Sequence, residues 1–178
     1  MQTVKAEVQV FLGEKDIEAR VQELADEISR DYAGMDVMLV CTLGGAVFFL
    51  ADLARLLKIP VQIEYVKASS YGDGTDSSKN VRLEYTPGDR IKGKHVLWVE
   101  DIVDTGRTYA HLERHLRAQE PASLKLVSLL DKPSRREWND VKIDYLGFTI
   151  PDKFVVGYGL DFAGNYRNLP YIGVLKQT

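Results

Sequence analysis

Apolar residues along this chain follow two spacings, which predict a mixture of helices and strands. The N-terminal part carries one helical face, with apolar residues three or four positions apart and a glycine stop signal after them. These residues are Ile17, Val21, Leu24 and Ile28, followed by Gly34. Elsewhere, short continuous apolar runs are typical of buried parallel strands. The runs cover residues 37–41, 61–66, 81–85, 96–99 and 124–130, and further helical faces cover residues 47–57 and 109–116.

The order of these elements predicts the fold class. Strands that alternate with helices form a parallel sheet joined by right-handed crossovers. We therefore expect an α/β protein with a mainly parallel twisted sheet flanked by helices. After residue 132 the pattern changes to short strands near residues 145–148, 154–158 and 171–175. We expect these strands to form a small hood lobe over the carboxyl edge of the sheet.

Length and composition predict the domain organisation. The chain has 178 residues, enough for one well-cored domain, and no Pro-rich, Ser-rich or charge-rich linker divides it. We expect a single domain over residues 1–178. Its hood lobe should come mainly from residues 133–178 together with the N-terminal segment.

The most informative segment is residues 96–108, where an apolar strand turns acidic and then leads into a helix. Glu100 and Asp101 follow the apolar run directly, so they lie at the carboxyl edge of the sheet, where open α/β folds bind ligands. The hydroxyl-rich turn from Asp104 to Thr108 opens the helix, and backbone amides at a helix N-terminus suit a phosphate monoester. The segment therefore predicts acids for ribose hydroxyl groups beside a phosphate site.

A glycine loop lies at the end of an earlier strand. Leu43, Gly44 and Gly45 join that strand to a helix, and they offer backbone amides without obstructing side chains. This arrangement suits pyrophosphate, although a glycine turn needed only for close packing is the alternative. Residues 69–80 are polar, contain glycine and show no periodicity, which predicts a mobile surface loop.

Lys132 follows another apolar strand and should project from the same edge of the sheet. A lysine side chain has three hydrogen-bond donors and no acceptor. It could therefore accept a ligand with a 6-oxo group and reject one with a 6-amino group. Taken alone, the position could equally hold an ordinary surface lysine.

These segments together resemble the type I phosphoribosyltransferases. Residues 96–108 match the motif of that family closely, and Lys132 with residues 150–161 and 165–173 resembles the purine pocket of members that act on hypoxanthine and guanine. The resemblance implies the type I phosphoribosyltransferase fold. It also implies transfer of a 5-phosphoribosyl group from phosphoribosyl pyrophosphate to N9 of a 6-oxopurine, giving IMP or GMP and pyrophosphate.

The resemblance implies sugar and phosphate contacts on three loops. Glu100 and Asp101 hold the ribose hydroxyl groups, and Asp104 is the catalytic residue, a proton acceptor near purine N7. Ionisation of the base elsewhere is the alternative source of the purine anion. The 5′-phosphate contacts are Thr105, Gly106, Arg107 and Thr108, and the pyrophosphate contacts are Leu43, Gly44, Gly45 and Arg167.

On the base side, the resemblance implies that Lys132 reads the 6-position, Phe154 stacks on the purine and Val155 reads its edge through backbone groups. Without the resemblance, Phe154 could be simple core. Ser70 and Tyr71 match the start of the active-site lid of the family. Such a lid would protect the reacting sugar from water.

Magnesium is the cofactor that the resemblance implies. Asp161 holds one ion through water, and a second ion, shared by ribose hydroxyl groups and pyrophosphate, lies beside Glu100 and Asp101. Asp161 could otherwise be a turn cap. One departure stands out, because better-known members of the family carry Lys or Arg where this chain has Gly44. A side-chain contact from that position to pyrophosphate is absent here.

Charge and composition bear on partners and location. The net charge of −3 argues against a nucleic-acid surface, and no apolar run approaches the length of a bilayer. The N-terminus lacks the pattern of a secretory signal, and the single Cys41 sits in an apolar strand. We expect a cytoplasmic enzyme, without nucleic-acid or membrane partners, that forms a homodimer or homotetramer.

Other functions stay open at this point. The chain could be a regulator that senses phosphoribosyl pyrophosphate, or a related transferase for adenine or a pyrimidine. The absence of an appended DNA-binding module disfavours the first, and the Lys132 and Phe154 segments disfavour the second. His111 and His115 have metal-ligand spacing without an evident third ligand, and Phe162 replaces the third glycine of a dinucleotide motif.

Overall fold

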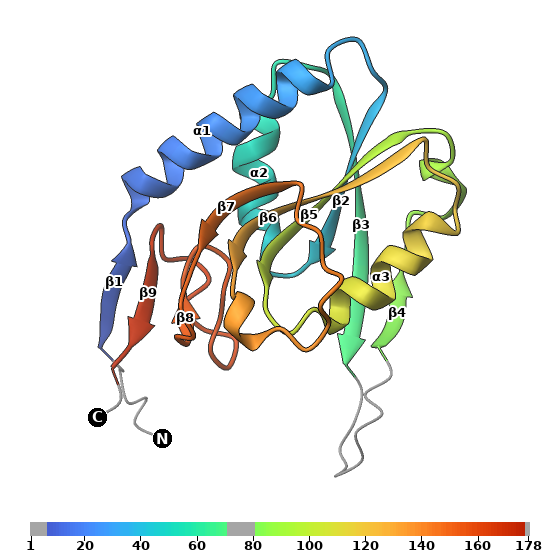
Figure 1. Ribbon diagram of the computed structural model, residues 1–178. Helices are drawn as coiled ribbons and strands as arrows, with labels where there is room; N and C mark the ends of the chain where they lie inside the picture. Colours follow the sequence, from blue (N-terminus) through green and yellow to red (C-terminus); the bar gives the residue numbers. More distant parts are fainter. Residues whose placement is uncertain (1–6, 71–80, 177–178) are drawn as a thin grey trace.

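The computed structural model describes residues 7–70 and 81–176 (Figure 1). Its centre is a six-stranded sheet with the order β4-β3-β2-β5-β6-β7. All neighbouring strands in it run parallel except the edge strand β4, which is antiparallel to β3. This confirms the predicted mainly parallel sheet. The strands are β2 (Val37–Leu43), β3 (Val61–Ser70), β4 (Val81–Tyr85), β5 (His95–Val103), β6 (Ser123–Asp131) and β7 (Tyr145–Thr149).

Helices cover both faces of this sheet because its strands bury alternate residues on opposite sides. In β2, Leu39 and Cys41 belong to the core shared with α1 and α2, whereas Met38 and Val40 belong to the core shared with α3. The predicted helices are therefore confirmed as two layers around a central sheet. Their bounds are α1 (Glu14–Asp31), α2 (Ala46–Leu56) and α3 (Arg107–Arg117), with short 3-10 helices at η1 (Gly88–Ile91) and η2 (Pro133–Arg135).

A second, three-stranded sheet lies beside the first (Figure 1). It consists of β1 (Val8–Leu12), β9 (Ile172–Leu175) and β8 (Val155–Val156), all antiparallel, so the N-terminal strand pairs with the C-terminal one. We call this sheet and the loop over residues 157–169 the hood lobe.

The prediction that the strand near residues 145–148 belongs to the hood lobe is wrong. This strand, β7, is the parallel edge strand of the main sheet and pairs with β6. Tyr145 is buried in the core beneath α1, and Arg20 of α1 donates to the carbonyl oxygens of Leu146 (2.7 Å) and Gly147 (3.1 Å). These contacts with α1, distant in sequence, hold β7 on the main sheet.

Two strands are longer than their apolar runs predict. β5 continues to Val103 because it stays paired with β6, so Glu100 and Asp101 lie within the strand instead of after it. β3 continues to Ser70 because β4 pairs with it in the antiparallel sense. The remainder of the polar loop predicted from residue 69 lies outside the described residues.

Cys41 is fully buried in β2. Burial raises the pKa of its thiol to about 12, with the charges of Glu100 and Asp101 contributing. A thiol in that environment is inert, as expected for a small core residue. Among the helices in the described part of the chain, none has the length and apolar character needed to cross a membrane.

Candidate active site

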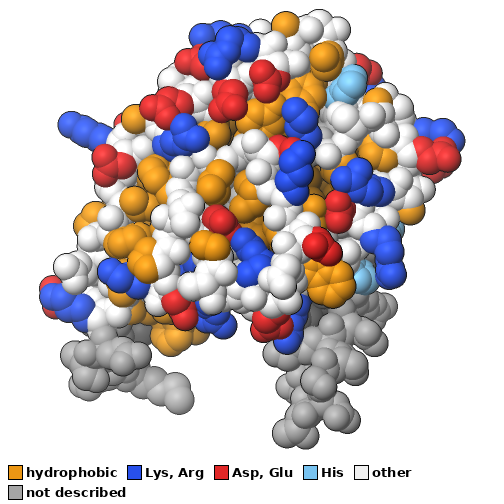
Figure 2. Space-filling model, viewed as in Figure 1, with side chains coloured by type: hydrophobic (Ala, Val, Ile, Leu, Met, Phe, Trp, Pro, Cys, Tyr) orange, Lys and Arg blue, Asp and Glu red, His pale blue; other side chains and the backbone are white. Residues whose placement is uncertain are grey.

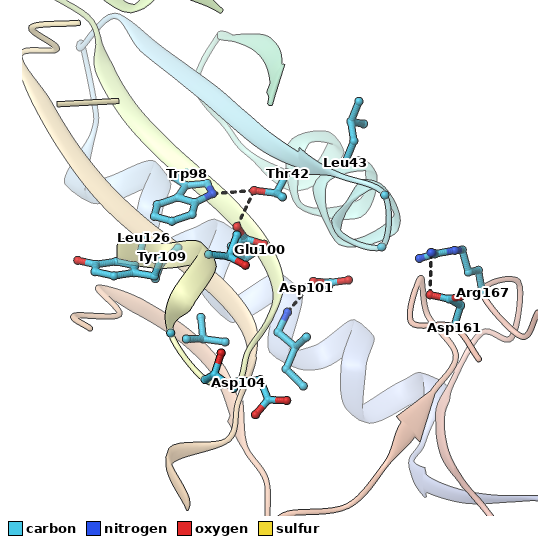
Figure 3. Close-up of a pocket in the computed structure, with 17 residues that line it drawn as sticks. Thr42, Leu43, Trp98, Glu100, Asp101, Asp104, Tyr109, Leu126, Asp161 and Arg167 are labelled. Atoms are coloured by element: carbon cyan, nitrogen blue, oxygen red, sulfur yellow. Dashed lines mark hydrogen bonds and ion pairs between the residues drawn. The ribbon is translucent and has the colours of Figure 1, made fainter. Parts of the chain in front are cut away.

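A cavity of about 390 Å³ lies where β2 and β5 end at the carboxyl edge of the main sheet. The β2–α2 turn, the end of β5 and the turn into α3 line it from the sheet side. The hood lobe contributes Asp161 and Arg167 from the other side (Figure 3). The structure thus brings three sequence-predicted loops and two distant hood residues to one cavity, at the place where open α/β sheets bind ligands.

Glu100 and Asp101 form the acidic wall of the cavity. Glu100 is 7% exposed, and burial raises its pKa to about 8, with the Asp101 charge adding to the effect and the hydrogen bond from Thr42 opposing it. Burial also raises the pKa of Asp101, opposed chiefly by the hydrogen bond from the Ile102 amide (2.8 Å). Because two desolvated carboxyl groups lie side by side, hydroxyl donors or a cation would be favourable ligands here.

Glu100→Gln should make the stability of the protein less sensitive to rising pH between 4.5 and about 8. The pKa of Glu100 is about 8 in the fold and 4.5 in its ordinary state, so the folded protein holds an extra proton between these values. The extra proton on Glu100 contributes to the free energy of unfolding. This contribution is complete below pH 4.5 and is lost as the pH rises through about 8. We expect a wild-type loss on the order of a few kcal/mol across this window, and a much smaller loss for the variant.

Denaturant unfolding of both proteins at a series of pH values measures this difference. The exposed Glu18 offers a control, because Glu18→Gln should keep the wild-type slope of stability against pH. Parallel slopes for wild type and Glu100→Gln would contradict the prediction.

The glycine loop approaches the acidic wall closely. A Cβ atom at Gly45 would lie 1.8 Å from Asp101 Oδ2 and 3.0 Å from the carbonyl oxygen of Gly159 in the hood lobe. A Cβ atom at Gly44 would lie 3.9 Å from the Arg167 guanidinium carbon, which is an ordinary contact. The peptide bond between Leu43 and Gly44 is cis. Within this loop, close packing excludes a side chain at Gly45 and not at Gly44, so packing explains the glycine only at Gly45.

Gly45→Ala should destabilise the protein by roughly 1–3 kcal/mol, because the new methyl group must displace the Asp101 carboxylate. Gly44→Ala is the matched control and should leave stability nearly unchanged, and Gly44→Lys should also fold. Thermal unfolding of the three variants measures this. Equal losses for Gly44→Ala and Gly45→Ala would show that the close approach to Asp101 is not the cause.

The turn from Asp104 to Thr108 leads into the N-terminus of α3. Gly106 has a φ of 83°, and a Cβ atom there would lie 2.8 Å from Val141 Cγ2, so both backbone and packing require glycine. The Thr105 carbonyl oxygen accepts hydrogen bonds from the amides of Glu137 (3.0 Å) and Trp138 (3.1 Å), which anchor the turn. Thr105, Gly106 and Thr108 line the cavity.

Arg107 is placed differently from the other turn residues. Its side chain pairs with Glu137 (Nε to Oε2, 2.6 Å), and it does not line the cavity. The sequence assigned Arg107 to phosphate binding together with its neighbours. In the structure, its side chain is engaged elsewhere, and the backbone amide is the part that belongs to the turn.

Asp104 lines the cavity beneath the turn (Figure 3). Its Oδ1 atom lies 3.2 Å from Arg135 Nε, yet the angles do not make this ion pair a hydrogen bond, and Oδ1 is buried without a hydrogen-bond donor. Arg136 donates to the Asp104 backbone oxygen (2.7 Å) and fixes the main chain there. The carboxylate is therefore held in position while it keeps the capacity to accept a proton or a hydrogen bond.

Asp161 and Arg167 pair with each other across the hood loop, with Arg167 Nη2 2.7 Å from Asp161 Oδ1. Arg167 also donates from Nη1 to the Gly159 carbonyl oxygen (2.5 Å), and the Gly164 amide donates to Asp161 Oδ2 (2.8 Å). The guanidinium thus lies against the glycine loop at Gly44. A positive charge and free backbone amides together suit an anionic ligand.

The three residues predicted to contact a base lie outside the cavity lining. Lys132 is 5% exposed, its amide donates to the Val103 carbonyl oxygen, and its ammonium group has no partner in the described part of the chain. The surface-lysine alternative is therefore wrong. Phe154 is 56% exposed and meets Phe162 edge-on at 5.7 Å, so the core alternative is wrong too. Val155 is buried in β8.

The predicted lid residues are only partly described. Ser70 ends β3, whereas Tyr71 lies outside the described residues.

Sequence reasoning missed six residues that line the cavity, which are Thr42, Trp98, Ile102, Val103, Tyr109 and Leu126. For Thr42 and Trp98 the signal is the strand register. β2 pairs with β5 in parallel, with Val40 opposite Trp98, so continuing this register by two residues places Thr42 opposite Glu100 on the same face. The prediction needed the pairing of two strands far apart in sequence.

The carboxylates of the cavity bear on metal binding. Within residues 7–70 and 81–176, no group of three or more His, Cys, Asp or Glu side chains could hold a metal ion by itself. Glu100, Asp101, Asp104 and Asp161 nevertheless line one cavity. Mg²⁺ takes oxygen ligands and is commonly bound through one or two carboxylates together with substrate phosphates. The donor set fits a magnesium ion that is bound together with a phosphorylated substrate.

Comparison with known proteins agrees with this geometry. Residues 11–163 match the family model of the phosphoribosyl transferase domain. The chain is 44% identical over 172 residues to the hypoxanthine phosphoribosyltransferase of Salmonella typhimurium, covering 96% of each protein. It is 43% identical over 168 residues to the hypoxanthine-guanine phosphoribosyltransferase of Streptococcus pneumoniae, covering 94% of this chain and 93% of that protein.

A solved structure shares the fold throughout. The crystal structure of a hypoxanthine-guanine phosphoribosyltransferase from Bacillus anthracis superposes with a TM-score of 0.89 at 42% identity, covering 96% of this chain and 100% of that one. The family expected from the motifs is therefore confirmed over nearly the whole chain. This chain belongs to the phosphoribosyl transferase family and, within it, to the hypoxanthine and hypoxanthine-guanine phosphoribosyltransferases.

Proposed function

We propose that this chain transfers the 5-phosphoribosyl group of phosphoribosyl pyrophosphate to N9 of hypoxanthine or guanine, giving IMP or GMP and pyrophosphate. The observation that carries the proposal is the single cavity that joins an acidic strand end, a helix N-terminus and a glycine loop beside an arginine. These are the groups that a ribose, a 5′-phosphate and a pyrophosphate require. The names of the relatives point to the same reaction.

On the sugar, we assign Glu100 and Asp101 to the ribose hydroxyl groups, because desolvated carboxyl oxygens are strong acceptors. The amides of residues 105–108 and the Thr108 hydroxyl group bind the 5′-phosphate at the start of α3. Together these contacts hold the anomeric carbon in one place, which lowers the entropic cost of reaching the transition state.

Pyrophosphate is the leaving group, and the glycine loop and Arg167 orient it. The Arg167 guanidinium lies against Gly44, so it can stabilise negative charge next to the backbone amides. Arg167 is paired with Asp161, and pyrophosphate would compete for that guanidinium. Asp161, Glu100 and Asp101 would hold Mg²⁺, which when bound neutralises charge that develops on the leaving group.

The base lies on the side of Lys132. The Lys132 side chain is almost fully buried, and its ammonium group has no partner among the described residues, so the group is available to pair with a ligand. A 6-oxo group would supply that acceptor. Phe154 presents an exposed ring for stacking, and the backbone of Val155 completes the edge contact. Asp104 accepts the proton from N7 as the purine attacks.

One assay tests the proposal. The protein is incubated with Mg²⁺, phosphoribosyl pyrophosphate and, separately, hypoxanthine, guanine, xanthine, adenine and uracil, and nucleotide is detected by chromatography. We expect IMP and GMP, with little AMP and no UMP. Binding of phosphoribosyl pyrophosphate without nucleotide formation would favour the regulator, and AMP or UMP as the main product would favour another transferase. The cytoplasmic location, the homodimer or homotetramer and the absence of nucleic-acid and membrane partners stay predictions.

A further inference from the structure

A chain of two hydrogen bonds runs from the sheet core to the acidic wall of the cavity (Figure 3). Trp98 Nε1 lies 2.8 Å from Thr42 Oγ1, and Thr42 Oγ1 lies 2.5 Å from Glu100 Oε1. An indole N–H can only donate, so the Thr42 oxygen accepts from Trp98. When Glu100 is ionised, the single hydroxyl proton of Thr42 is then directed at Glu100 Oε1. A carboxylate can only accept, so in that state the direction of both hydrogen bonds is fixed.

Trp98, the first donor of these two hydrogen bonds, is held rigidly. Trp98 is 1% exposed and stacks on Tyr109 of α3, with ring centroids 5.4 Å apart and planes 16° apart. The indole cannot turn without disrupting the core between the sheet and α3. The Thr42 hydroxyl group is therefore held in one orientation, and the Glu100 carboxylate that accepts from it is held as well.

We infer that Thr42, held by Trp98, is a positioning residue that orients the Glu100 carboxylate for phosphoribosyl pyrophosphate. Its hydrogen bond occupies Oε1 and leaves Oε2 for a ribose hydroxyl group. Because Glu100 contacts ribose only in the proposed reaction, the inference rests on that proposed function. In this role Thr42 acts through Glu100.

Thr42→Val tests the inference, because valine keeps the shape of the side chain and removes the hydroxyl group. We expect the affinity for phosphoribosyl pyrophosphate, measured by calorimetry with Mg²⁺, to fall roughly tenfold, as for loss of one hydrogen bond to a charged group. The KM for phosphoribosyl pyrophosphate should rise in parallel, while the KM for hypoxanthine stays within about twofold. Thr42→Ser keeps the hydroxyl group and should restore most of the affinity.

A matched control separates positioning from simple destabilisation. Ser29 on α1 is buried, accepts from the Lys58 amide (2.9 Å) and donates to the Ala25 carbonyl oxygen (2.6 Å), as Thr42 accepts and donates. Ser29→Ala should lower thermal stability without changing the affinity for phosphoribosyl pyrophosphate. An affinity loss in Ser29→Ala equal to that in Thr42→Val would overturn the inference.

A second comparison uses Trp98→Phe, which removes the indole donor. In the wild-type background, Thr42→Val leaves the indole donor buried and unpaired, whereas in the Trp98→Phe background that donor is gone. Thr42→Val should therefore lower stability less in the Trp98→Phe background. The affinity for phosphoribosyl pyrophosphate should stay low in the double variant. If affinity recovers together with stability, or if Thr42→Val binds as tightly as the wild type, the inference is wrong.

The proposed function can fail separately. A wild-type protein that binds phosphoribosyl pyrophosphate without making nucleotide would overturn the reaction, and the calorimetric comparison would still decide the role of Thr42. A wild-type protein that does not bind it at all would overturn both.

Discussion

Lys132→Gln is expected to weaken the use of hypoxanthine and to narrow its advantage over adenine. The Lys132 side chain is almost fully buried and its ammonium group is unpaired within the described residues, so a 6-oxo group can pair with it, whereas a 6-amino group would leave donors facing each other. Such mismatches discriminate by roughly 10⁴-fold in a desolvated site. Glutamine presents a donor or an acceptor. We expect the hypoxanthine-to-adenine ratio of kcat/KM to fall by about 10²-fold or more.

Steady-state kinetics with both bases at saturating phosphoribosyl pyrophosphate measure this ratio. Affinity for phosphoribosyl pyrophosphate should change little. As a control, Lys125→Gln removes a lysine of β6 that lies over the rings of Tyr32 and Tyr145, and it should leave base selection unchanged. If Lys132→Gln kept full hypoxanthine efficiency and the same rejection of adenine, backbone groups near Val155 would have to read the 6-position.

Asp104→Asn is expected to lower turnover by roughly 10²-fold or more, because asparagine keeps the shape of the side chain and cannot accept the N7 proton. The turn that binds the 5′-phosphate should persist, since the Arg136 bond to the Asp104 backbone oxygen and the amide bonds to Thr105 do not involve the carboxylate. Affinity for phosphoribosyl pyrophosphate should therefore change much less than turnover. Single-turnover kinetics and calorimetry measure the two quantities.

The neighbouring Asp152 provides the control for this variant. Arg135 lies 3.8 Å from Asp152 as well as 3.2 Å from Asp104, so Asp152→Asn also removes a negative partner of Arg135. It should leave turnover near the wild-type value. Unchanged turnover in Asp104→Asn, with the chemical step rate-limiting, would rule out an essential proton transfer to Asp104.

The order of helices and strands could be predicted from the sequence because each depends on a short-range pattern. The alternating burial of β2 and the helical face of α1 both follow from spacing within one segment. The acidic strand end and the turn at residues 104–108 could be predicted for the same reason. They are consecutive in the chain, so their proximity needs no knowledge of the fold.

Pairings between distant segments were decided only by the tertiary structure. β7 joins the main sheet because α1 holds it there, although its sequence is that of any short strand. The Arg107 side chain turns to Glu137 instead of the cavity, and the Lys132 side chain is buried although its ammonium group has no partner among the described residues. Each outcome depends on which other segment packs nearby, and local spacing carries no such information.

The cavity itself shows both contributions. By itself, the sequence determined the chemical groups: carboxyl groups, a glycine loop and a hydroxyl-rich turn on strand ends that share one edge. The tertiary structure decided their orientation, through the register that sets Thr42 beside Glu100 and through the hood loop that places Arg167 against Gly44. Residue types follow from the chain, whereas the geometry that lets them act together requires contacts made only after folding.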